Sequence, residues 1–233
     1  MAPPVIGSLA QRGRPRTVEL VGPAGAGKST LARLLCRLDP SFRPRLTAWD
    51  LSPWMLAKHG LRELGILARS GRPPQVRHLV CLHDLTRVRA LCARLQQENV
   101  HRHEVVLLDE GPVFLLTRAL AFQSVALQSP MVWERWEEAL RHCAAAVDEV
   151  FWVDAPDHQL AERIRTRAKP HRVKAASDTE ISNFCGAYRA GFLEMTSLFA
   201  DHDGPRVTCF TEDERLHLVA KRMANALRSV HVG

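Results

Sequence analysis

The amino-acid sequence predicts an α/β fold in which a five-stranded parallel sheet is covered by helices on both faces. Strand-length apolar runs alternate with helical patterns along the chain, and this alternation is typical of parallel sheets. The run Val105-Val-Leu-Leu108 is apolar at every position, as expected for a central strand with both faces buried. The strands are expected at residues 17–21, 45–49, 105–108, 150–153 and 206–210.

Helical patterns fill the intervals between these strands. The first covers Lys28–Leu38, where apolar residues recur with the i, i+3, i+4, i+7 spacing of one helix face. Capping residues predict the starts of three later helices: Ser52 before Pro53, Ser177 with Glu180, and Thr211 with Glu214. Further helices are expected at residues 54–100 with a break at 71–74, at 112–127, at 131–146, and from 157 onward.

Composition places the chain among soluble globular proteins. A chain of 233 residues with 46% hydrophobic and 24% charged residues can form one folded domain. We expect a flexible basic arm at residues 1–15 and a single domain at 16–233. The six cysteines are scattered without a C-x-x-C pair, and no apolar segment has membrane-spanning length, so we expect free thiols and a cytoplasmic protein. The net charge of +7 suits anionic ligands, although arginine richness can equally reflect genomic base composition.

A glycine-rich segment lies between the first strand and the first helix. Gly22-Pro-Ala-Gly-Ala-Gly-Lys-Ser29 matches the pattern G-x-x-x-x-G-K-[ST]. Its glycines allow backbone N–H groups to surround phosphates, and the following helix directs its positive end at the same place. We therefore predict an ATP site in which Lys28 reaches the β- and γ-phosphates and Ser29 holds Mg²⁺. The predicted nucleotide-binding residues in this segment are Gly22, Ala24, Gly25, Ala26, Gly27, Lys28, Ser29 and Thr30.

Two carboxylates follow the central strand. Asp109 occupies the position at which P-loop folds place the acidic residue that faces magnesium. Glu110 comes next and could serve as a catalytic base or as a partner of the metal-binding residues. The structural alternative is a strand-end carboxylate that begins the turn at Gly111-Pro112. We predict that Asp109 is a magnesium ligand, directly or through water.

Asp50 is a second candidate for the base. It ends the predicted strand at 45–49, which in the usual doubly wound order would lie beside the glycine-rich loop. A carboxylate there could take the proton of an acceptor hydroxyl during phosphoryl transfer. The alternative is an ordinary aspartate at a helix start before Ser52-Pro53, and the sequence leaves both readings open.

A basic run extends from the helix after the fourth strand into a loop. Arg163 and Arg167 share one helix face at 100° per residue, and Arg165 points elsewhere. A flap that carries arginines over the phosphates would stabilise the transition-state charge. A solvated basic face is the alternative. The run consists of Arg163, Arg165, Arg167, Lys169, Arg172 and Lys174.

Three segments resemble the P-loop small-molecule kinases, and most of all the thymidylate kinase and deoxynucleoside kinase group. They are GPAGAGKST at 22–30, VVLLDEGP at 105–112 and VFWVDAPDHQLAERIRTRAK at 150–169. The resemblance implies a five-stranded parallel sheet, ATP as the phosphoryl donor and Mg²⁺. It also implies a helical lid at about 163–177 in which Arg163 and Arg167, with Arg172 as a further candidate, close on the phosphates.

Two positions depart from the thymidylate kinase pattern. That family has Asp-Arg-aromatic where this chain has Asp109-Glu110-Gly111-Pro112, and a Glu-Pro-Gly type of loop where it has Trp49-Asp50-Leu51-Ser52. With Asp50 in this loop, the chain is instead similar to P-loop kinases that phosphorylate a hydroxyl on a non-nucleotide. We expect residues 54–100 and 112–146 to build the acceptor pocket.

The sequence therefore predicts an ATP-dependent kinase for a small-molecule hydroxyl on a nucleoside, a sugar or an antibiotic-like alcohol. The alternatives are a thymidylate-like nucleoside monophosphate kinase and a regulatory ATPase. None of the five lysines is followed by x-Asp, which excludes the usual guanine-binding motif. We expect no nucleic-acid or membrane partner and leave a homodimer open.

Overall fold

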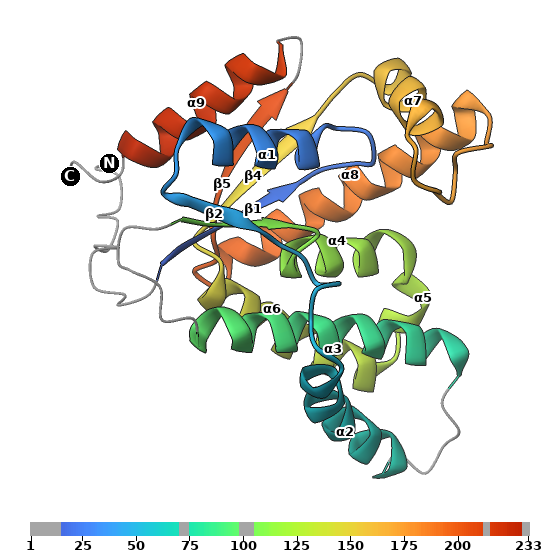
Figure 1. The fold of residues 1–233 in the computed structure, drawn as a ribbon. Helices are drawn as coiled ribbons and strands as arrows, with labels where there is room; N and C mark the ends of the chain where they lie inside the picture. The colour runs from blue at the N-terminus through green and yellow to red at the C-terminus, as the bar shows by residue number, and fades with distance from the viewer. Residues whose placement is uncertain (1–14, 70–74, 98–104, 212–214, 230–233) are drawn as a thin grey trace, which may run out of the picture.

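The computed structural model describes residues 15–69, 75–97, 105–211 and 215–229. Its centre is a five-stranded sheet in the order β2-β3-β1-β4-β5, in which every neighbouring pair is parallel (Figure 1). The strands are β1 (Arg16–Val21), β2 (Phe42–Leu46), β3 (Val105–Asp109), β4 (Glu149–Asp154) and β5 (Arg206–Thr211). The predicted α/β fold class with a parallel sheet is confirmed.

Helices cover both faces of the sheet. In Figure 1, α1 and α9 lie on one face, and α3, α4, α6 and α8 lie on the other. The helices are α1 (Lys28–Leu38), α2 (Pro53–Arg69), α3 (Val76–Gln97), α4 (Pro112–Phe122), α5 (Ser124–Leu127), α6 (Pro130–Ala146), α7 (Asp157–Thr166), α8 (Asp178–Ala200) and α9 (Leu216–Ser229).

The central strand β3 divides its side chains between two buried layers. Val106 and Leu108 pack in the layer that contains α3, α4 and α6, and Val105 and Leu107 pack in the layer that contains α1 and α9. Successive side chains of a strand point to opposite faces, so a strand with a core on each side is apolar throughout. This explains the continuous apolar run in the sequence.

Two of the predicted helix caps are present. The hydroxyl of Ser52 accepts a hydrogen bond from the Met55 N–H at 3.3 Å at the start of α2. Ser177 and Glu180 form the reciprocal capping box of α8, in which the Glu180 carboxylate accepts from the Ser177 N–H at 2.8 Å. The third prediction is wrong, because Thr211 belongs to β5 and α9 begins at Leu216; its partner Glu214 lies outside the described residues.

The second strand differs from the prediction in both position and neighbours. It covers Phe42–Leu46 rather than 45–49, because its pairing with β3 begins at Phe42 opposite Val105. It is an edge strand, where the missing N–H of Pro44 is tolerated. Because β3 separates β2 from β1, the chain after β2 is not adjacent to the strand that precedes the glycine-rich loop.

The predicted lid also differs in its local structure. Only its first residues are helical, as the end of α7, and the backbone from 167 to 177 forms turns before α8 begins at Asp178. The described part of the chain contains no helix that is both long and apolar enough to cross a membrane.

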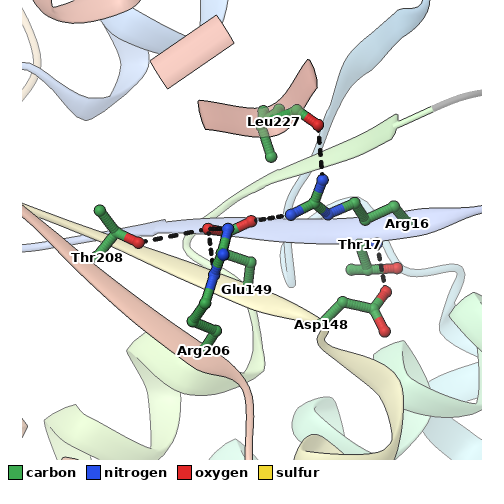
Figure 2. A network of polar contacts seen from close by, with 7 residues as sticks. All are labelled: Arg16, Thr17, Asp148, Glu149, Arg206, Thr208 and Leu227. Carbon is green, nitrogen blue, oxygen red and sulfur yellow. Dashed lines mark hydrogen bonds and ion pairs between the residues drawn. The ribbon is translucent and has the colours of Figure 1, made fainter. Parts of the chain in front are cut away.

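An ion cluster around the buried Glu149 holds the amino ends of three strands together (Figure 2). Glu149 of β4 is 1% exposed and accepts hydrogen bonds from Arg16 of β1 and, at 2.6 Å, from Arg206 of β5. Arg16 also donates to the Leu227 carbonyl of α9 at 2.8 Å. A buried carboxylate is stable when it is paired in this way. The cluster lies at the end of the sheet opposite the loops that follow β1 and β3.

Candidate active site

A cavity of about 630 Å³ opens where β1 and β3 end. The glycine-rich loop forms one side of it, and α4 and α8 form the other. The lining residues are Gly22, Ala24, Gly25, Gly27, Lys28, Ser29, Thr30, Asp109, Glu110, Phe114, Arg118, Phe122, Arg163, Thr166, Arg167, Pro170, His171, Phe184, Tyr188 and Leu216.

The glycine-rich loop packs tightly against its neighbours. Gly22 has φ of 155°, and a Cβ added there would meet the Val153 carbonyl oxygen at 1.9 Å. Gly25 has φ of 85°, and its Cβ would lie 3.0 Å from the Leu160 carbonyl oxygen of α7. Both positions therefore require glycine for conformation and for space. The loop is seated on the end of β4 and on α7.

Lys28 is the first residue of α1, and its side chain turns back into the loop. Its Nζ donates hydrogen bonds to the carbonyls of Gly22 and Pro23, both at 2.8 Å. Burial lowers the pKa of Lys28, and the nearby charges of Asp109 and Glu110 act in the opposite direction. The ammonium group thus lies inside the curve of the loop and close to two carboxylates.

Ser29 and Asp109 bring two oxygen atoms together beside the loop. The Ser29 hydroxyl donates to Asp109 Oδ2 at 2.6 Å, and Asp109 is 3% exposed at the end of β3. A hydroxyl and a carboxylate are hard oxygen ligands, which suit Mg²⁺. These two residues therefore fit the predicted metal role chemically.

Arg163 lies on α7, whereas Arg167 follows the end of that helix at Thr166 and has extended backbone, so the two do not share a helix face as predicted. Arg163 and Arg167 both line the cavity, and Arg163 donates to the Gly25 carbonyl at 3.3 Å. Arg165 points elsewhere and pairs with Asp178 at 2.5 Å. The guanidinium of Arg172 lies 6.0 Å from the Phe122 ring centroid, beside the cavity.

Arg189 of α8 fixes the start of α7, and sequence reasoning missed it. It donates to both carboxylate oxygens of Asp154, at 2.7 and 3.0 Å, and to Asp157 at 2.6 Å. A hydrogen bond from Ser182 and the contact with Arg189 lower the pKa of Asp157. The end of β4, the first turn of α7 and the middle of α8 are thereby joined.

The far side of the cavity is aromatic. Phe122 of α4 stacks on Phe184 of α8 with ring centroids 4.8 Å apart. The rings of Phe114 and Tyr188 are tilted by 37° to each other, with centroids 5.8 Å apart. Arg118 lies on the same helix as the two α4 phenylalanines. Of the two segments expected to build the acceptor pocket, 112–146 contributes through α4, whereas no described residue of 54–100 lines the cavity. The contribution of α8 was not expected.

The structure separates the two candidate bases. Glu110 lines the cavity and has a left-handed φ of 60°, an uncommon conformation that is found at functional sites. Asp50 is exposed, and its carboxylate accepts from the backbone N–H and hydroxyl of Thr47 at 3.1 and 2.9 Å. It lies outside the cavity lining that the described residues form, because β2 is not next to β1 as expected.

A second residue that sequence reasoning missed is Glu19, which is fully buried in β1. Its two oxygens accept hydrogen bonds from the N–H groups of Val113 and Phe114 at 2.9 and 2.8 Å, at the start of α4. Burial raises the pKa of Glu19 to about 8, although these hydrogen bonds act to lower it. A Cβ on Gly111 would lie 2.7 Å from the Glu19 carboxyl carbon. The only signal in the sequence was a charge within an apolar strand.

The strand order β2-β3-β1-β4-β5, with a glycine-rich loop after β1 and arginines beside it, is the fold of the P-loop small-molecule kinases. Solved structures agree. Thymidylate kinase from Candida albicans superimposes with a TM-score of 0.60 at 13% identity, over 93% of this chain and 92% of that one. Deoxyadenosine kinase from M. mycoides, with dCMP and dCDP bound, gives 0.53 at 13% identity over 92% and 99%.

Shikimate kinase from Acinetobacter baumannii, in complex with shikimate, gives a TM-score of 0.50 at 16% identity over 95% of this chain and 97% of that one. Compared by sequence, the chain matches no family model and no curated protein. The similarity therefore establishes a shared fold over nearly the whole chain. The chemistry has to be argued from the site.

Proposed function

We propose that this protein is an ATP-dependent kinase that transfers the γ-phosphoryl group to a hydroxyl of a small molecule, such as a nucleoside, a sugar or an antibiotic-like alcohol. The observation that carries the proposal is one cavity with two unlike halves. A phosphate-binding type of loop, with the Lys28 ammonium inside its curve, forms one half, and an aromatic compartment forms the other. Its volume of about 630 Å³ suits small-molecule ligands.

The loop half would hold ATP. Backbone N–H groups of the loop bind the phosphates, and the Lys28 ammonium exchanges its bonds to the Gly22 and Pro23 carbonyls for the β- and γ-phosphates. Arg163 and Arg167 add positive charge where the transferred group becomes most charged. Ser29 and Asp109 would hold Mg²⁺, which when bound neutralises charge on the phosphate oxygens.

The aromatic half would hold the acceptor, with Glu110 next to both halves. Burial lowers the pKa of Lys28, and the negative charge of Glu110 acts against this change. Burial raises the pKa of Tyr188, and the charge of Glu110 raises it further. Glu110 therefore lies near the loop lysine and near an aromatic wall residue. This position favours Glu110 over Asp50 as the base.

The transfer then balances in one step. The acceptor hydroxyl gives its proton to the Glu110 carboxylate while its oxygen forms a bond to the γ-phosphorus. The bond between that phosphorus and the β–γ bridging oxygen breaks, and ADP leaves with the electron pair. Glu110 afterwards releases the proton to water.

One observation favours a second candidate, a nucleoside monophosphate kinase. Arg118 lines the acceptor half and could meet a phosphate there. Its guanidinium is already paired with Asp84 at 2.6 Å, which reduces the charge available to an anionic acceptor. We therefore rank the hydroxyl acceptor first.

The test begins with purified protein, ATP and magnesium, and a panel of nucleosides, nucleoside monophosphates, sugars and antibiotic alcohols. ADP formation and the mass of the product identify the acceptor. Phosphorylation of a neutral alcohol supports the proposal, and phosphorylation of monophosphates alone supports the second candidate. Slow ATP hydrolysis with no acceptor product in the whole panel would overturn both.

The active acceptor then distinguishes the two carboxylates. Glu110→Gln should lower kcat by about 10²–10⁴ with little change in ATP affinity, because the amide has lost the basicity of a carboxylate. Asp50→Asn is the isosteric counterpart in the neighbouring turn and should retain kcat near that of the wild type. The reverse pattern would assign the base to Asp50.

A further inference from the structure

Trp49 touches two residues that line the acceptor half of the cavity. Its indole N–H donates to Glu110 Oε2 at 2.5 Å, and the Arg118 guanidinium carbon lies 5.6 Å from its ring centroid. Trp49 lies in the turn after β2 and is 61 residues away from Glu110 in sequence. One residue outside the cavity lining thus contacts both the candidate base and the nearby cation.

The turn that carries Trp49 is itself fastened to the site. The Ala48 N–H donates to the Glu110 carbonyl at 3.1 Å. Arg87 donates to the Ala48 carbonyl at 2.8 Å and places its guanidinium carbon 4.6 Å from the Trp49 ring centroid. The backbone and side chain of the turn therefore both hold Glu110, whose left-handed conformation needs such support.

Core packing does not account for this tryptophan. Its exposed fraction is 44%, and two of its ring contacts are guanidinium groups, which bind the face of an indole. A half-exposed aromatic ring on a surface turn gains little from burial, whereas its single N–H is a directed donor. The contacts it makes are polar and point to the cavity residues.

We propose that Trp49 is a positioning residue for the acceptor reaction: its indole N–H holds Oε2 of Glu110, which leaves Oε1 to take the acceptor proton, and its ring orients Arg118. This proposal rests on the proposed kinase function. Trp49 itself takes no part in proton transfer. Its effect is to keep the carboxylate of Glu110 in one orientation during the reaction.

Trp49→Phe tests the N–H separately from the ring. Phenylalanine keeps a face for the guanidinium groups but donates no hydrogen bond. Loss of this hydrogen bond to the charged Glu110 carboxylate should lower kcat by about 10- to 100-fold. KM for ATP should stay within about twofold, because the loop half of the cavity is unchanged. Trp54→Phe is the matched control, since Trp54 is 77% exposed in α2, and it should behave as the wild type.

Nuclear magnetic resonance provides a readout that needs no acceptor. The ¹H–¹⁵N indole signal of Trp49, assigned by its loss in Trp49→Phe, should shift in Glu110→Gln, whereas the Trp54 signal should not. An unmoved Trp49 signal would overturn the proposal, as would wild-type kcat in Trp49→Phe. An equal loss of kcat and ATP affinity would also overturn it, because that pattern indicates a general structural role. Failure of the proposed function is read separately, from wild-type protein that phosphorylates no acceptor.

Discussion

Glu19 should make the stability of this protein fall as the pH rises from acidic to mildly alkaline values. Its pKa is about 8 in the folded protein, against an ordinary value of 4.5. Below pH 4.5 the group is protonated in both the folded and unfolded states. Between pH 4.5 and 8 the unfolded chain releases a proton that the folded protein retains, so the free energy of unfolding decreases as the pH rises. Above pH 8 the loss is complete.

The magnitude follows from the two pKa values. A change of one pKa unit corresponds to about 1.4 kcal/mol, so a shift from 4.5 to about 8 corresponds to about 5 kcal/mol. A domain of this kind has a total stability of roughly 5–15 kcal/mol. The effect of this one carboxyl is therefore large enough to measure against the background of the other titrating groups.

Glu19→Gln removes this group while it preserves shape. The amide nitrogen would face an N–H at the start of α4, which costs stability by an amount that does not depend on pH. Urea unfolding followed by circular dichroism at pH 5, 6, 7, 8 and 9 gives the difference between wild type and variant. The advantage of the wild type should shrink by about 4 kcal/mol between pH 5 and 9, because the unfolded chain is already partly ionised at pH 5.

A difference that stays constant with pH would refute the reasoning. It would mean that Glu19 is already ionised at pH 5. The two backbone N–H groups of α4, which favour the charged form, would then outweigh burial, which favours the neutral form.

Two further predictions concern the phosphate half of the cavity. Lys28→Ala should abolish most phosphoryl transfer, because the ammonium group inside the loop is lost; unchanged turnover of ATP in a coupled assay would contradict the proposed role. Arg163→Ala and Arg167→Ala should each lower kcat more than they weaken binding of an ATP analogue measured by calorimetry, because their charge is used chiefly as the γ-phosphoryl group departs. Equal losses in the two measurements would identify them as ground-state contacts.

Features set by neighbouring residues could be predicted from the sequence. The pattern from Gly22 to Ser29 placed the loop and the start of α1 at Lys28, and the capping box at Ser177 placed the start of α8. In each case the signal and its structural consequence lie within a few residues.

Features set by strand order and by long-range contacts could not be predicted. The contacts of Glu19 with α4, of Arg189 with Asp154, and of Trp49 with Glu110 join residues 35 to 95 positions apart. None of them is visible until the sheet is assembled. The predicted position of Asp50 beside the glycine-rich loop was wrong for the same reason, because it depended on which strand lies beside β1.

Gly22 packs closely against Val153, and Gly25 packs closely against α7. This side of the cavity therefore tolerates little substitution, and the opposite wall tolerates more. The loop, β4 and the arginine helix interlock through backbone atoms, where a side chain larger than hydrogen has no room. The opposite wall consists of side chains on α4 and α8, which can be exchanged one at a time. On the proposed function, replacing Phe114 would change which acceptor fits, while the loop that faces the phosphates would keep its shape.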